Sequence, residues 1–155
     1  MAGRIEKRLK DIGITLPNAP APVANYVPFV VHRDLVFVSG QVPFVGSSLS
    51  YVGTVGGNLS LEDGQQAARI CALNVLSQLR VACSGDLDRV TRCVRLGGFV
   101  NAALNFKLHP QIINGASDLM VQVFGELGRH ARFAVGAQNL PGGAAVEVEG
   151  IFAIT

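Results

Sequence analysis

The chain has 155 residues, of which 49% are hydrophobic and 15% charged, and its formal net charge is +2. This length is typical of one domain that buries about 70% of the surface of its unfolded chain. So few charges cannot cover a monomer in the usual way, which indicates that some apolar surface faces another subunit. The basic residues form no clustered face, and this argues against a nucleic-acid partner.

The cysteines and the N-terminus predict where the protein is found. Cys71, Cys83 and Cys93 are odd in number, widely spaced and without a CxxC pair, which favours reduced, buried thiols. The charged N-terminus lacks an apolar signal-peptide core, and no segment reaches the ~18 apolar residues that a membrane span needs. We therefore expect a cytoplasmic protein without a membrane partner.

The N-terminal part divides into an extension and the start of the main domain. Residues 2–13 have the pattern of a short amphipathic helix, and a proline-rich extended segment follows it. We assign residues 1–23 to this helix and extension and residues 24–155 to one domain. Two β-type runs, Val27–His32 and Leu35–Ser39, flank a turn and predict a hairpin.

The Gly- and Ser-rich segment 45–58 predicts a loop with room for a short edge strand. Apolar residues then recur at steps of three and four from Leu61 to Cys83, with Ser60 available as N-cap, which predicts a helix. A β-type alternation over Val90–Val100 predicts the next strand.

The C-terminal third predicts a second helix and two strands. This helix has Pro110 in its first turn and an apolar stripe, and Gly128 suits the position just past its end. Residues 132–138 and 145–154 have β character and are separated by the turn NLPGG. The predicted order ββαβαββ favours an α+β protein with a single sheet, both helices on one face and the other face covered by a neighbouring subunit.

Most motif-defined enzyme classes are absent from the sequence. There is no phosphate-binding loop, HExxH motif, nucleophile elbow or EF-hand loop. His32, His109 and His130 lack metal-ligand spacing, so we predict structural roles for them and no metal site.

Arg132 stands out because it opens an otherwise apolar strand. With a period of two it shares a face with Ala134, Gly136 and Gln138. The small Ala134 and Gly136 leave space beside a guanidinium. The planar fork of an arginine binds a carboxylate through two hydrogen bonds. The spacing is equally compatible with a structural ion pair to a buried glutamate.

Glu147 and Glu149 share one face of the last strand. Two carboxylates within ~7 Å raise the pKa of at least one of them, unless a cation lies between them or one points into solvent. Such a carboxylate can hold and polarise a water molecule, although exposure at a strand end explains the pattern as well. Ser39 and Gly40 mark a place where strand backbone allows a ligand to approach closely.

Several motifs together resemble the Rid family, the reactive intermediate deaminases also called the YjgF family. The resemblance spans about residues 24–155 and includes LVFVSGQVP, INGASDLMVQVFGELG and ARFAVGAQNLPGGAAVEVEGIFAI. The most specific parts are SGQ-hydrophobic-P, AR-x-x-V and LP followed by VE-hydrophobic-E. The resemblance implies a chorismate-mutase-like fold, a homotrimer and three clefts between subunits.

The resemblance also implies hydrolysis of small enamines and imines such as 2-aminoacrylate, which gives a 2-keto acid and ammonia without a cofactor. In that reaction an arginine binds the carboxylate of the substrate, main-chain groups near the start of the 132–138 strand orient the imine, and a glutamate positions the water. The matching positions are Arg132 and Glu147 as catalytic residues and Tyr26, Ser39, Gly40, Asn114 and Ala134 as substrate-binding residues.

The chain departs from the family pattern in three places. Ala134 stands where many deaminases have a cysteine, the central strand ends in GGFVNA without the usual Asp, and residues 102–111 form a longer segment. These departures suggest a divergent subgroup. Two alternatives to a deaminase are a protein that binds a small carboxylate metabolite without turnover and a translation-inhibiting ribonuclease. The missing basic patch argues against the ribonuclease.

Overall fold

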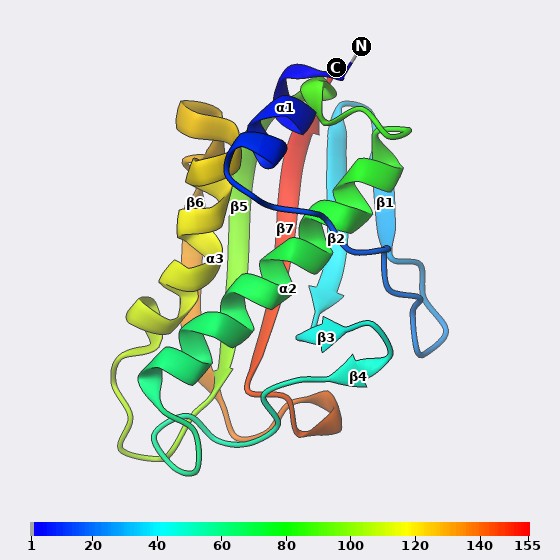
Figure 1. Cartoon of the computed structure of the whole chain (residues 1–155). Helices are drawn as coiled ribbons and strands as arrows, with labels where there is room; N and C mark the ends of the chain where they lie inside the picture. Colours follow the sequence, from blue (N-terminus) through cyan, green and yellow to red (C-terminus); the bar gives the residue numbers. More distant parts are fainter. Residues whose placement is uncertain (1) are drawn as a thin grey trace.

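A computed structural model describes residues 2–155. The protein has one main sheet, two long helices on one of its faces, and a short N-terminal helix (Figure 1). The helices and strands are α1 (Arg4–Asp11), β1 (Phe29–His32), β2 (Leu35–Gln41), β3 (Phe44–Val45), β4 (Ser48–Leu49), α2 (Leu61–Ala82), β5 (Val90–Asn101), α3 (His109–Phe124), β6 (Ala131–Ala137) and β7 (Val146–Ile154).

The main sheet has the strand order β1-β2-β7-β5-β6. β5 and β6 are parallel and joined through α3, whereas β1–β2, β2–β7 and β5–β7 are antiparallel. α2 and α3 cross the same face of the sheet, and the start of α1 and the residue after β7 both contact the segment 88–89 (Figure 1). This α+β fold agrees with the predicted order ββαβαββ.

The core forms because the sheet and the helices each have one apolar face. In β7 every second side chain is buried, including those of Val146, Val148 and Phe152, while Glu147 and Glu149 lie on the other face. α2 contributes a buried stripe with Ala68, Ala72, Val75 and Leu79. Burying a side chain of the size of leucine or valine contributes about 1.5–3 kcal/mol.

Ser60 caps α2 as the sequence predicts. Its hydroxyl accepts a hydrogen bond from the Asp63 amide at 3.1 Å, and the Asp63 carboxylate accepts one from the Ser60 amide at 2.9 Å. This reciprocal arrangement satisfies two backbone donors at the start of the helix.

The sequence prediction was incomplete in one loop and wrong at one helix end. The segment 45–58 forms no edge strand of the main sheet; instead β3 and β4 pair with each other around Gly46, whose φ is 61°. Gly128 is not the residue that ends the second helix. That helix ends at Phe124, and Gly125 takes the positive φ of 61°, because Gly128 is buried against the backbone of Met120.

All three cysteines are free and buried. Burial raises the pKa of Cys71 and Cys83 above the usual thiol range, and it raises the pKa of Cys93 to about 12. The thiols are therefore protonated at neutral pH and unreactive, as expected for core residues.

Candidate functional site

Arg132 is the second residue of β6 and lies on the side of the sheet that α3 covers. Its Nη1 atom donates to the side-chain oxygen of Asn114 at 2.8 Å and to the hydroxyl of Ser117 at 3.2 Å. Its Nη2 atom donates to the carbonyl of Pro110 at 3.4 Å. The guanidinium is therefore fixed against the first three turns of α3, and Ala134 lies next to it on the same strand face.

His130 positions the Ser117 hydroxyl that contacts Arg132. Its Nε2 atom lies 2.8 Å from the Ser117 hydroxyl and its Nδ1 atom 2.6 Å from the Gly128 carbonyl. Since a carbonyl only accepts, Nδ1 carries the proton and Nε2 accepts from Ser117. Burial, followed by the nearby charge of Arg132, lowers the pKa of His130, while its hydrogen bond to Gly128 opposes this.

The structure distinguishes between the two interpretations of Arg132. None of the ion pairs found within residues 2–155 includes it. All its hydrogen-bond partners are neutral oxygens, and a guanidinium has further N–H donors beyond those that they engage. An arginine held by neutral groups beside a small residue can bind an external carboxylate.

Glu147 lies on the opposite face of the sheet. In the register Phe99 pairs with both Val135 of β6 and Glu147 of β7, and directly paired residues point to the same side. Arg132 is an odd number of positions from Val135 along β6, so the side chains of Arg132 and Glu147 point to opposite sides. Within one chain the two predicted catalytic residues do not meet.

The two glutamates of β7 have different surroundings. Glu149 pairs with Arg95 at 2.6 Å, and the Arg95 guanidinium lies 5.5 Å from the centroid of the Phe133 ring. Glu147 takes part in none of the ion pairs among the described residues, and burial raises its pKa. Arg95 thus neutralises Glu149 and not Glu147. Glu147 is therefore the carboxylate whose pKa is raised.

Gly40 contacts Glu147, and the other two predicted residues, Tyr26 and Ser39, lie near Gly40. A side chain at Gly40 would collide with the Glu147 carboxylate, so the glycine allows the carboxylate to lie directly on the backbone of β2. Gly40 also borders a small hollow together with Tyr26. Next to it, the Ser39 hydroxyl donates to the Val27 carbonyl at 2.8 Å, which ties the chain beside Tyr26 to β2.

The predicted site residues therefore form two groups on opposite sides of one chain. The clamp half comprises Asn114, Arg132 and Ala134, and the glutamate half comprises Tyr26, Ser39, Gly40 and Glu147. From the sequence we did not expect Ser117, His130 or Arg95 in the site. Only His130 could have been found from its position, because it lies two residues before Arg132. The contacts of Ser117 and Arg95 depend on the packing of α3 and β5.

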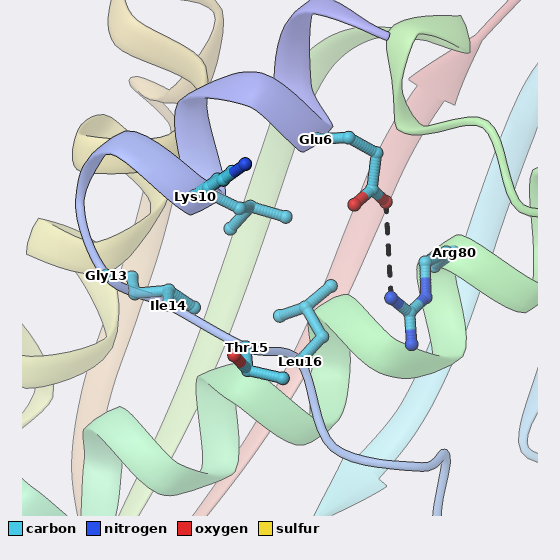
Figure 2. Close-up of a pocket in the computed structure, with 8 residues that line it drawn as sticks. Glu6, Lys10, Gly13, Ile14, Thr15, Leu16 and Arg80 are labelled. Atoms are coloured by element: carbon cyan, nitrogen blue, oxygen red, sulfur yellow. Dashed lines mark ion pairs between the residues drawn. The ribbon is translucent and has the colours of Figure 1, made fainter. Parts of the chain in front are cut away.

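A separate hollow of about 300 Å³ lies between α1 and α2 (Figure 2). Glu6 and Arg80 face each other across it at 4.0 Å, and Lys10 and Thr15 also line it. Glu6 and Arg80 form an ion pair at the surface, so this hollow is a groove between two helices. It contains none of the predicted site residues.

Two other kinds of functional feature are absent from residues 2–155. No group of three or more His, Cys, Asp or Glu side chains there is arranged to hold a metal ion. None of the helices in that range is long and apolar enough to cross a membrane.

The sequence and the fold agree with one protein family. A family model described as "YjgF/chorismate_mutase-like, putative endoribonuclease" matches residues 6–151. The chain belongs to this YjgF (Rid) family. The match begins within α1, so most of the N-terminal helix lies in the family region.

Three relatives cover nearly the whole chain. "Protein TCP17" of Trypanosoma cruzi is 48% identical over 151 residues, which are 97% of this chain and 94% of the relative. The crystal structure of Atu1372 of Agrobacterium tumefaciens, a protein with unknown function, is 44% identical with a TM-score of 0.91, covering 97% of this chain and 92% of that one. A structure from Shewanella oneidensis MR-1 titled "putative endoribonuclease" is 33% identical with a TM-score of 0.94, covering 98% and 100%.

Proposed function

We propose that this protein is an imine and enamine deaminase whose active sites lie between subunits of a homotrimer. The observation that carries the proposal is the state of Arg132, a positioned guanidinium without an acidic partner beside a small residue on an edge strand. The resemblance of its motifs to the Rid deaminases supports imine hydrolysis as the reaction class. The separation of the clamp half from the glutamate half means that a second copy of the chain must complete each site.

The clamp half binds and orients the substrate. Arg132 forms two hydrogen bonds with the carboxylate of a small 2-imino acid, while Asn114 and Ser117 prevent the guanidinium from rotating. β6 pairs only with β5, so its outer edge presents free backbone groups to the imine beside Ala134. A main-chain contact there works equally well with alanine or cysteine at position 134.

The glutamate half activates water. Glu147 of the neighbouring subunit accepts a hydrogen bond from a water molecule and directs its oxygen to the imine carbon. Addition of this water across the C=N bond gives a carbinolamine. When its C–N bond breaks, the nitrogen leaves as ammonia and the carbon keeps the oxygen as a 2-keto acid. The raised pKa of Glu147 makes the carboxylate a stronger base for this step.

Replacing Arg132 by alanine tests the proposal. Imines generated in situ by an amino-acid oxidase are supplied, and keto-acid release is measured for wild type, Arg132→Ala and Arg132→Lys. We expect Arg132→Ala to lower kcat/KM by a factor of about 100 or more, because a charge-assisted bidentate contact contributes on the order of 3 kcal/mol. Lysine should restore only part of the rate because it lacks the fork. Equal rates in all three proteins would refute the proposed role.

Two other results would favour different functions. Binding of benzoate or 2-keto acids with no turnover of any imine would identify a binding protein that uses the same clamp. The word endoribonuclease in the family description makes RNA cleavage the other competing activity. Nuclease activity that survives rigorous purification and disappears in Arg132→Ala would favour it over deamination.

A further inference from the structure

A large hollow lies beside the clamp half. It has a volume of about 620 Å³ and opens at the end of β6, next to the first turn of α3. Its lining combines apolar side chains with two polar groups. The residues that shape it are Ala103, Leu104, Phe106, His109, Gly136 and Gln138.

The wall of this hollow comes from the segment between β5 and α3, the region that is longer than in typical family members. Phe106 and His109 pack edge to face, with ring centroids 5.4 Å apart at 79°. Leu104 is 99% exposed at the rim. An aromatic ring, an exposed leucine and an imidazole form a wall suited to a largely apolar group.

The floor of the hollow is Gly136. A Cβ atom at this position would lie 2.8 Å from Nε2 of His109, so the glycine allows the imidazole to lie directly against the backbone of β6 and out of the hollow. His109 lines the hollow, and its ring nitrogens take part in none of the side-chain hydrogen bonds found within residues 2–155. The imidazole can therefore form a hydrogen bond with a bound molecule.

The hollow lies next to the clamp along one strand face. Arg132, Ala134 and Gly136 follow one another on the same face of β6, in steps of about 6.6 Å. Arg132 contacts the carbonyl of Pro110, the residue that follows His109. A substrate whose carboxylate is bound by Arg132 and whose imine lies beside Ala134 can therefore extend its side chain along β6 into the hollow.

We infer that this hollow is the side-chain pocket of the active site and selects 2-imino acids with large aromatic side chains. The inference rests on the proposed function and names its substrate class. The single methylene of 2-aminoacrylate would leave the hollow empty. A phenyl ring instead packs against Phe106 and Leu104, and the His109 imidazole faces its edge or a polar substituent on it.

The test compares imines made in situ from phenylalanine and alanine, in wild type and in Gly136→Val. Gly136 has no positive φ and lies on an edge strand, so valine suits its backbone. Its side chain would meet the His109 imidazole and push it into the hollow, which narrows the pocket. We expect wild type to prefer the aromatic imine by about tenfold or more in kcat/KM, as is typical of a hydrophobic pocket. Gly136→Val should remove this preference by lowering kcat/KM for the phenylalanine imine more than kcat/KM for the alanine imine. Thr15→Val in the hollow between α1 and α2 is the control and should change neither rate.

The outcomes separate this inference from the proposed function. Turnover of both imines without an aromatic preference, or a preference that Gly136→Val leaves intact, overturns the pocket while deamination stands. If neither imine is turned over, the proposed function fails, and the pocket is tested by binding of pyruvate and phenylpyruvate in a calorimeter. Tighter binding of phenylpyruvate that is lost in Gly136→Val supports the pocket; equal or absent binding of both acids overturns it.

Discussion

Arg132 is positioned by a chain of hydrogen bonds that ends at a backbone carbonyl. The guanidinium donates to Ser117, Ser117 donates to His130, and His130 donates to the Gly128 carbonyl. Each group in this series of hydrogen bonds has a defined role as donor or acceptor. The rotamer of Arg132 is therefore set before any ligand binds. Preorganisation of this kind reduces the entropy lost on binding.

Removing the Ser117 hydroxyl should loosen the clamp without removing its charge. We expect Ser117→Ala to weaken binding of a 2-keto acid about tenfold, since a hydrogen bond to a charged group contributes about 1.5 kcal/mol. Titration calorimetry measures this change, with Ser117→Thr as the control because it keeps the hydroxyl. Unchanged affinity in Ser117→Ala would show that Asn114 and the Pro110 carbonyl are enough to position the guanidinium.

His130 should make the stability of the protein depend on pH. Its pKa is lower in the folded protein than in the unfolded chain, mainly through burial, so the unfolded chain binds the proton more readily. The stabilisation is therefore present above about pH 6.5, the ordinary value, and is lost as the pH falls below it. Urea unfolding between about pH 7 and pH 5 should show a smaller loss of stability for His130→Gln than for wild type. Parallel curves for the two proteins would contradict this assignment.

The sequence predicted Arg132 and Glu147 but not the side chains that control them. A period of two placed Arg132 beside Ala134, and the motif VE-hydrophobic-E separated Glu147 from Glu149. Ser117 and Arg95 could not be inferred, because the first depends on the rotation of α3 against β6 and the second on the register of β5 with β7. Long-range packing of this type leaves no periodic signal in a single sequence.

At the scale of elements, hydrophobic periodicity located the two long helices and the sheet within a few residues, because each has an extended apolar face. Short elements carry less signal. The β3–β4 hairpin has two residues per strand, and the end of α3 depends on which of two glycines, Gly125 or Gly128, takes a positive φ. That choice follows from the burial of Gly128 against Met120, a tertiary contact.

The N-terminal helix is attached by a cap from a distant residue. The two carboxylate oxygens of Asp88 accept hydrogen bonds from the amides of Arg4 and Ile5, both at 2.7 Å, and Ile5 and Leu9 are buried in the core. We expect Asp88→Ala to lower the free energy of unfolding by about 1 kcal/mol, as for other lost N-caps. Thermal unfolding measures this loss, and faster amide exchange in α1 should accompany it. Asp34→Asn, in the β1–β2 turn, is the control; an equal effect there would exclude a specific cap.

At the scale of the whole molecule, the open face of the sheet explains the sparse charge of the sequence. This face carries Phe99 and Phe133, which pack edge to face with centroids 5.3 Å apart, and Phe37, which is 41% exposed. It also carries Glu147, whereas Arg132 lies on the helix side. An assembly that covers this face can bring the glutamate half of one chain to the clamp half of the next, so one apolar surface would serve both stability and catalysis.

Mixing two inactive variants tests whether each site is shared between chains. Arg132→Ala lacks the clamp and Glu147→Gln lacks the base, so each should be inactive alone. If every site takes its arginine from one chain and its glutamate from the next, refolding an equal mixture should restore both residues in about one quarter of the sites of a closed ring. Keto-acid release should then recover to about one quarter of the wild-type rate, once mass spectrometry verifies mixed assemblies.

The double variant provides the matched control for this experiment. In an equal mixture of wild type with Arg132→Ala/Glu147→Gln, shared sites are intact only where two wild-type chains meet, which leaves about one quarter of the activity. Sites contained in single chains would leave about one half, and the two inactive variants would then fail to rescue each other. Shared sites predict about one quarter of the wild-type activity in both mixtures, whereas single-chain sites predict about one half in the control mixture and none in the other. Either mixture therefore distinguishes the two models if subunit exchange is incomplete in the other preparation.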